Sequence, residues 1–117
     1  MRQCLTAHAR YSPAVRSSPS GGGASGEHDA VYVPHLSWIT GDLDTHDVVM
    51  PADFRPIFVS SLFSCLAGVS DGFSFRPLWR PPFITRLAPE DRCHLNGLAC
   101  DPDGQPRYVT LEQFPTK

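Results

Sequence analysis

Two stretches decide the fold: HDVVMPADFRPIFVS, residues 46–60, and NGLACDPDGQPRYVT, residues 96–110. A shift of about 50 residues lays one over the other without gaps, so that Asp53 meets Asp103. A strand-entry proline and a run of aromatic, valine and hydroxyl residues coincide in the same alignment. Repeats of roughly 40 to 50 residues are typical of propeller blades. The two stretches therefore predict neighbouring hairpins of one all-β body.

Short apolar runs separated by turn residues continue along most of the chain from Val31 onward, a pattern that predicts successive strands. The segment 80–95 has three prolines and no clean period, so we expect a long connection there, with one helical turn after Pro89. The expected strands lie in the runs 31–33, 47–50, 57–61, 62–70, 73–79, 96–100 and 107–111.

These elements predict a fragment of a β-propeller with about one and a half four-stranded blades, over residues 31–111. A disordered leader rich in Ser, Gly and Pro is expected at 1–30, and a tail at 112–117. Because a blade buries its faces against two neighbours, the faces that carry Phe58 and Trp79 are expected to be exposed to water.

The composition of this chain of 117 residues indicates which partners and which cellular compartment to expect. A formal charge of -2 gives no basic surplus for nucleic acid, and no apolar run approaches the ~20 residues that span a bilayer, so neither partner is expected. The four cysteines form no CxxC pair, and no signal-peptide core is recognisable. We expect reduced thiols and a cytoplasmic protein.

Four segments carry a family resemblance: TGDLDTHD (40–47), FSCLA (63–67), LWRPPFITRLAPEDRCHLNGLA (78–99) and PRYVT (106–110). Through them the chain resembles a bacterial family of conserved hypothetical proteins that is known only as a domain of unknown function. The resemblance implies a propeller-like protein without an established activity.

A weaker similarity concerns HLNGLACDPDGQPRYVT, residues 94–110, which is similar to gluconolactonase and senescence-marker type propellers. In those proteins an Asn at the start of an inner strand helps to hold a divalent cation in the central channel. The resemblance implies that Asn96 is such a ligand, with Ca²⁺, Mn²⁺ or Zn²⁺ as the cofactor of the complete protein. The remaining ligands would come from other blades.

The alternation of polar residues predicts a ligand cluster at the start of the second strand. Asp42, Asp44 and His46 project from one face of an extended chain, and Asp47 projects from the other. Their oxygens and single imidazole satisfy neither Ca²⁺ nor Zn²⁺ alone. Asp44 and His46, together with Asn96, which the resemblance implies as a ligand, are the predicted metal ligands. The alternative interpretation is a solvated acidic turn that caps the strand.

Polar residues at the equivalent start of the later hairpin extend this prediction. His94 and Asn96 share a face, and Asn96 lies over His46 in the alignment. With Asp47, and with Arg92 as a cation for an anionic ligand, they form the predicted ligand-binding set. Alternatively, His94 satisfies a loop carbonyl and Asn96 forms an Asx turn.

The favoured function is a scaffold that binds a small ligand or a protein, and catalytic residues are not assigned. Cys93 and His94 point to opposite faces of an extended chain, which argues against a thiolate nucleophile. The alternatives are a fragment of a metal-dependent, lactonase-like hydrolase and a truncated remnant without function. The sequence does not decide whether the protein is an enzyme.

Overall fold

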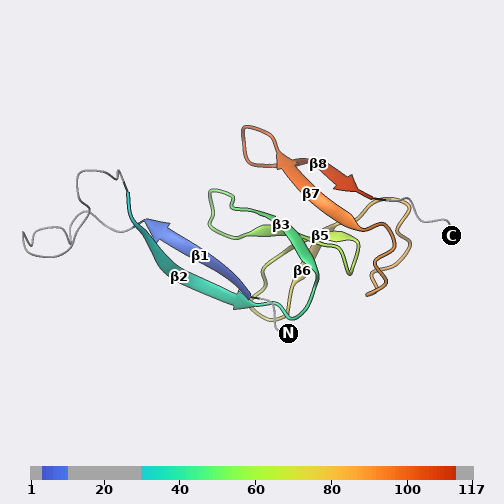
Figure 1. The fold of residues 1–117 in the computed structure, drawn as a ribbon, viewed down its shortest axis with the longest axis horizontal. Helices are drawn as coiled ribbons and strands as arrows, with labels where there is room; N and C mark the ends of the chain where they lie inside the picture. The colour runs from blue at the N-terminus through green and yellow to red at the C-terminus, as the bar shows by residue number, and fades with distance from the viewer. Residues whose placement is uncertain (1–3, 11–29, 113–117) are drawn as a thin grey trace, which may run out of the picture. The chain divides into compact units, whose positions relative to one another are not determined.

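The computed structural model describes residues 4–10 and 30–112, and the regular elements among them are all β-strands. In chain order the strands are β1 (Cys4–Arg10), β2 (Tyr32–Ile39), β3 (Thr45–Val49), β4 (Ile57–Ser60), β5 (Cys65–Gly68), β6 (Arg76–Trp79), β7 (Leu95–Cys100) and β8 (Pro106–Leu111) (Figure 1). The predicted all-β class is therefore confirmed. Within the described ranges, no helix has the length and apolar character needed to cross a membrane.

One compact unit is Leu5–Trp38, which contains the two-stranded sheet β1–β2. The hydroxyl groups of Thr6 and Ser37 lie 3.1 Å apart across the two strands. Strand β1 lies within the expected leader of 1–30, and its alternating sequence CLTAHAR suits a pleated strand whose partner, β2, follows more than 20 residues later. The leader's residues 11–29 lie outside the described residues.

The other unit contains Ile39–Lys117 and is built on a four-stranded antiparallel sheet in the order β3-β4-β5-β6. The central strands pair Phe58 with Ala67, and both residues are fully buried. The apolar and β-branched runs of the sequence thus form neighbouring strands joined by short turns. The strands expected in the runs 47–50, 57–61, 62–70 and 73–79 thus lie together in one sheet.

The hairpin β7–β8 forms a separate two-stranded sheet in the same unit, and β7 contacts β3 and β4. Between the hairpin and the four-stranded sheet lies an apolar cluster. Its buried members come from β4, β5, the long connection and the start of β7: Val59, Leu66, Ile84, Cys93 and Leu95. This packing holds the start of β7 close to the four-stranded sheet.

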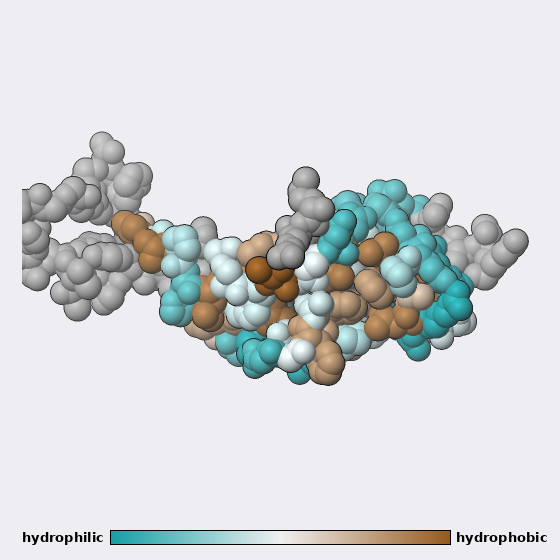
Figure 2. All heavy atoms as spheres, turned by 90° about the horizontal axis from the view of Figure 1, so that it is seen from below, coloured by the Kyte–Doolittle hydropathy of each residue, from teal (hydrophilic) through white to brown (hydrophobic). Residues whose placement is uncertain are grey.

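Two expectations for this unit differ from the structure. Residues 80–94 contain no helical turn after Pro89, because Asp91 and His94 both adopt a φ of 45°, outside the right-handed helical region. Phe58 was expected to be exposed to water but is 0% exposed, whereas Trp79 is 44% exposed, as expected. Figure 2 shows apolar (brown) residues that reach the surface among hydrophilic (teal) ones.

Candidate functional site

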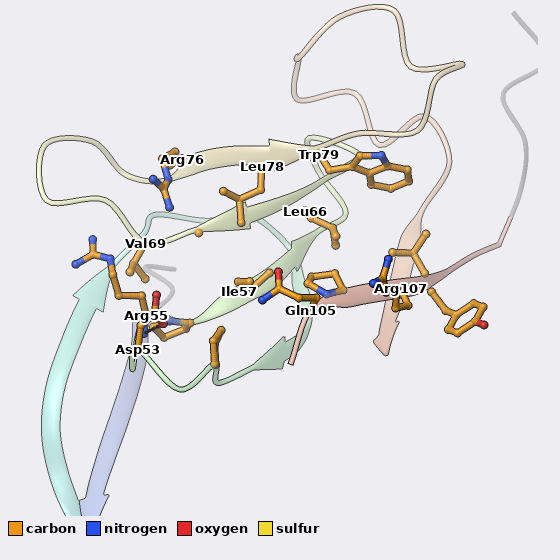
Figure 3. A pocket seen from close by; sticks show the side chains of 16 residues that line it. Asp53, Arg55, Ile57, Leu66, Val69, Arg76, Leu78, Trp79, Gln105 and Arg107 are labelled. Carbon is orange, nitrogen blue, oxygen red and sulfur yellow. Dashed lines mark hydrogen bonds between the residues drawn. The ribbon is translucent and has the colours of Figure 1, made fainter. Parts of the chain in front are cut away.

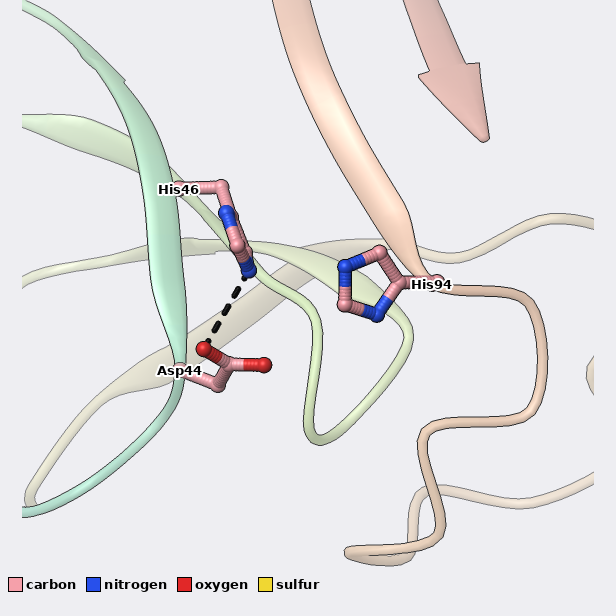
Figure 4. Close-up of side chains that lie close together, drawn as sticks. All are labelled: Asp44, His46 and His94. Carbon is pink, nitrogen blue, oxygen red and sulfur yellow. Dashed lines mark ion pairs between the residues drawn. The ribbon is translucent and has the colours of Figure 1, made fainter. Parts of the chain in front are cut away.

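Asp44, His46 and His94 bring their side chains together at the start of β3 and β7 (Figure 4). One potential metal-ligand atom of each residue lies within 4.8 Å of those of the other two. The carboxylate of Asp44 is 3.2 Å from Nε2 of His46, and the rings of His46 and His94 meet edge to face with centroids 4.9 Å apart. The cluster thus combines an oxygen and two imidazoles from two hairpins.

The backbone just before β3 and β7 positions these side chains. Asp44 has a φ of 50° and His94 a φ of 45°, so both residues occupy the left-handed region directly before a strand begins. The carbonyl of Asp44 accepts a hydrogen bond of 3.1 Å from the main-chain N–H of Ser61. Since few non-glycine residues adopt this conformation, the surrounding contacts must hold it.

A buried serine turn between β4 and β5 supplies several of those contacts, and the sequence analysis did not identify it. Ser60 donates to the carbonyl of Leu43 at 2.9 Å, and Ser61 donates to the carbonyl of Leu95. Ser64 accepts a hydrogen bond from a main-chain N–H of the long connection at 3.1 Å. The turn therefore ties together the segments that precede β3 and β7. Three serines within an apolar run were the available signal.

A carboxylate orients His94. Oδ2 of Asp91 accepts a hydrogen bond of 2.9 Å from Nδ1 of His94, which places the ring proton on Nδ1 and leaves Nε2 as the lone-pair nitrogen of the neutral ring. This hydrogen bond is the main reason that the pKa of His94 is raised above its ordinary value. Glu112 lies farther away, 3.8 Å from Nε2, and adds to the negative surroundings.

Asp47, a predicted ligand-binding residue, has a structural role. Its Oδ2 accepts a hydrogen bond of 2.9 Å from the main-chain N–H of Leu98, and its Oδ1 accepts one of 2.8 Å from the N–H of Val48. The carboxylate therefore links β3 to β7, and its two oxygens are already used by main-chain donors. This position agrees with the alternation that turned Asp47 away from Asp44 and His46.

Arg92 and Asn96, the other predicted ligand-binding residues, are placed by different contacts. The guanidinium of Arg92 donates to the hydroxyl of Thr85 at 3.0 Å. Asn96 is half-buried in β7. Cys93 is buried next to His94, and burial is the main cause of its raised pKa, which keeps the thiol protonated.

A hollow of about 590 Å³ opens on the same unit, between the strands β4 to β6 and the residues of β8 (Figure 3). Leu66 and Leu78 lie along its apolar floor, Arg55 and Arg76 are at one end, and Trp79 is at the other. The hollow is lined by the four-stranded sheet on one side and by the hairpin β7–β8 on the other. Its lining does not include the cluster of Asp44, His46 and His94.

The two sites differ in the chemistry that they can support. The cluster offers lone pairs on nitrogen and oxygen at short range, a donor set suited to a cation. The hollow offers apolar area and guanidinium groups, although Arg55 already lies 3.5 Å from Asp71. The cluster is the better candidate for a specific site, because its residues converge from two hairpins.

Comparison with known proteins places the chain in a family. No curated protein and no solved structure matches it significantly, so the weaker similarity to gluconolactonase-type propellers remains a prediction. A family model matches residues 14–113, which is most of the chain and starts within the expected leader. By that match the chain belongs to the family described as Domain of unknown function (DUF4915).

Proposed function

We propose that this chain is part of a propeller-type scaffold that binds a small ligand where two neighbouring hairpins begin. A four-stranded antiparallel sheet, followed by a hairpin whose first strand contacts it, is the arrangement of one blade and the start of the next. The residues at the two strand entries, Asp44 and His94, are about 50 positions apart and share a positive φ.

The turns within the two hairpins support the same relation. The N–H of Phe54 donates to the carbonyl of Pro51 at 3.0 Å, and the N–H of Gly104 donates to the carbonyl of Asp101 at 2.9 Å. Phe54 and Gly104 both have a positive φ and are again about 50 positions apart.

The observation that carries the proposed binding function is the convergence of Asp44, His46 and His94 from two hairpins. In a propeller, the inner strands of successive blades surround a central channel, so groups at their starts face a shared ligand. The proposed ligand is a small molecule or an ion rather than nucleic acid, because the chain has a formal charge of -2. We further propose a cytoplasmic location, since no disulfide joins the four cysteines, all of them described.

Histidine NMR signals test the binding function directly. The full chain is titrated with a panel of Ca²⁺, Mn²⁺, Zn²⁺ and small organic anions while the imidazole and amide resonances are recorded. The proposal expects one member of the panel to shift or broaden the signals of His46 and His94 and to leave those of His35, in β2, unchanged. A panel that moves neither His46 nor His94 would contradict it.

A further inference from the structure

The cluster of Asp44, His46 and His94 comes close to the geometry of a small transition-metal site. In a tetrahedral zinc site, ligand atoms about 2.0–2.2 Å from the ion lie about 3.4 Å from one another. Asp44 and His46 are already 3.2 Å apart, and all three ligand atoms lie within 4.8 Å. The largest of these separations exceeds the tetrahedral value by about 1.4 Å, a distance that rotation of the side chains can close.

The orientation of His94 is a second, independent observation. Its Nδ1 is held by Oδ2 of Asp91 at 2.9 Å, and Figure 4 shows the other ring nitrogen turned toward His46. Metal-binding histidines commonly donate their second ring N–H to a carboxylate in this way. The N–H of Asp91 in turn donates to the carbonyl of Leu62 at 2.9 Å, so the orienting residue is itself anchored.

We propose that Asp44, His46 and His94 bind a Zn²⁺-class divalent ion, with Asp91 as the positioning residue. The inference rests on the proposed function, because it names the ligand of that same site. Two imidazole nitrogens and one carboxylate oxygen suit Zn²⁺, with water as the remaining ligand, whereas Ca²⁺ takes 6–8 oxygen ligands. Asn96, predicted as a ligand from the sequence, is not needed for this site.

Binding of Co²⁺ and Zn²⁺ to the full chain tests the inference. Co²⁺ should give the visible absorption of a four-coordinate site, and Zn²⁺ should displace it while excess Ca²⁺ does not. Asp44→Asn and His94→Asn should abolish binding at concentrations that saturate the unchanged chain, and both should fold, because Asn tolerates a positive φ. Asp91→Asn should weaken binding about 10–100-fold.

His35→Asn and Asp103→Asn are the matched controls, and both should bind Zn²⁺ as the unchanged chain does. Circular dichroism of every variant checks that the sheets are retained. Loss of binding in either control, or retention of binding in His94→Asn, would show scattered surface chelation and overturn the site. If an organic anion shifts the NMR signals of His46 and His94 and the chain does not bind Zn²⁺, the assignment of the ligand as a metal ion is overturned. The proposed binding function would still hold in that case.

Discussion

Ser61 is a small residue with a large structural role, because its buried hydroxyl donates to the carbonyl of Leu95 at the start of β7. A buried polar group that loses its partner costs far more than an exposed one. The serine turn therefore determines where the second hairpin begins, and with it the position of His94.

We expect Ser61→Ala to lower the free energy of unfolding by about 1–3 kcal/mol, since it leaves a buried acceptor without this donor. The measurement is denaturant unfolding followed by circular dichroism. Ser74→Ala, at an exposed position, is the control and should change stability by less than about 0.5 kcal/mol. Equal effects of the two substitutions would show that the buried hydrogen bond adds nothing.

Ionisation of Cys65 makes the free energy of unfolding depend on pH in the alkaline range. Burial raises the pKa of this thiol from 9.0 to about 11. The folded chain therefore binds the thiol proton more tightly than the unfolded chain does. The resulting contribution to the free energy of unfolding is complete below pH 9 and is lost as the pH rises from 9 toward 11. Unfolding measured across this range should show a smaller pH dependence in Cys65→Ala than in Cys100→Ala. The same dependence in both variants would contradict the assignment to Cys65.

At the scale of the elements, Asp47 joins two strands that are far apart in sequence. Its carboxylate accepts a hydrogen bond from Leu98, and the contacts between β3 and β7 surround this link. Asp47→Ala should lower the free energy of unfolding by about 1–3 kcal/mol and speed hydrogen exchange at the Leu98 amide. Asp103→Ala removes the same charge at an exposed turn and should do neither. Slow exchange at Leu98 in Asp47→Ala would contradict the proposed link.

The turns of the two hairpins provide another test at this scale. Gly104 has a φ of 80°, and a Cβ there would meet nothing within 4 Å, so Gly104→Ala should cost about 1–2 kcal/mol through the backbone alone. Phe54 has a φ of 58° and is 62% exposed, so Phe54→Gly should raise stability by up to about 1 kcal/mol. Thermal and denaturant unfolding measure both changes. A neutral Gly104→Ala would show that the turn does not need glycine.

The strands of the unit Ile39–Lys117 could be predicted because β-branched and aromatic runs, such as 57–61 and 107–111, lie next to strong turn residues. Strand β1 was missed because its partner β2 lies beyond a stretch rich in Gly, Ser and Pro. The alternation within CLTAHAR suits a strand, but nothing local in the sequence identifies its distant partner.

The cluster could be predicted only in part. Alternation grouped Asp44 with His46, and these side chains lie 3.2 Å apart, but it could not reveal that β7 contacts β3 and brings His94 to them. The positive φ of Asp91 and His94 also has no signature in residues that usually avoid it, so a helical turn was expected instead. Long-range packing, rather than local preference, decides both features.

At the scale of the whole unit, the four-stranded sheet is covered unevenly. The hairpin β7–β8 contacts the sheet through β7 on β3 and β4, whereas the hollow lies over the rest of that face. Leu78 and Trp79 there are 42% and 44% exposed. Among the described strands, β8 pairs with β7 alone, so its outer edge is available for pairing.

An open strand edge beside exposed apolar area favours association with another chain. We therefore expect the full chain to self-associate as its concentration rises, and Leu78→Lys to weaken this association by placing a charge in the hollow. Sedimentation velocity over a concentration series measures the effect. Leu87→Lys is the matched control, because Leu87 is 40% exposed and does not line the hollow. If Leu87→Lys weakened association as much as Leu78→Lys, general charge repulsion rather than the uncovered sheet face would account for the change.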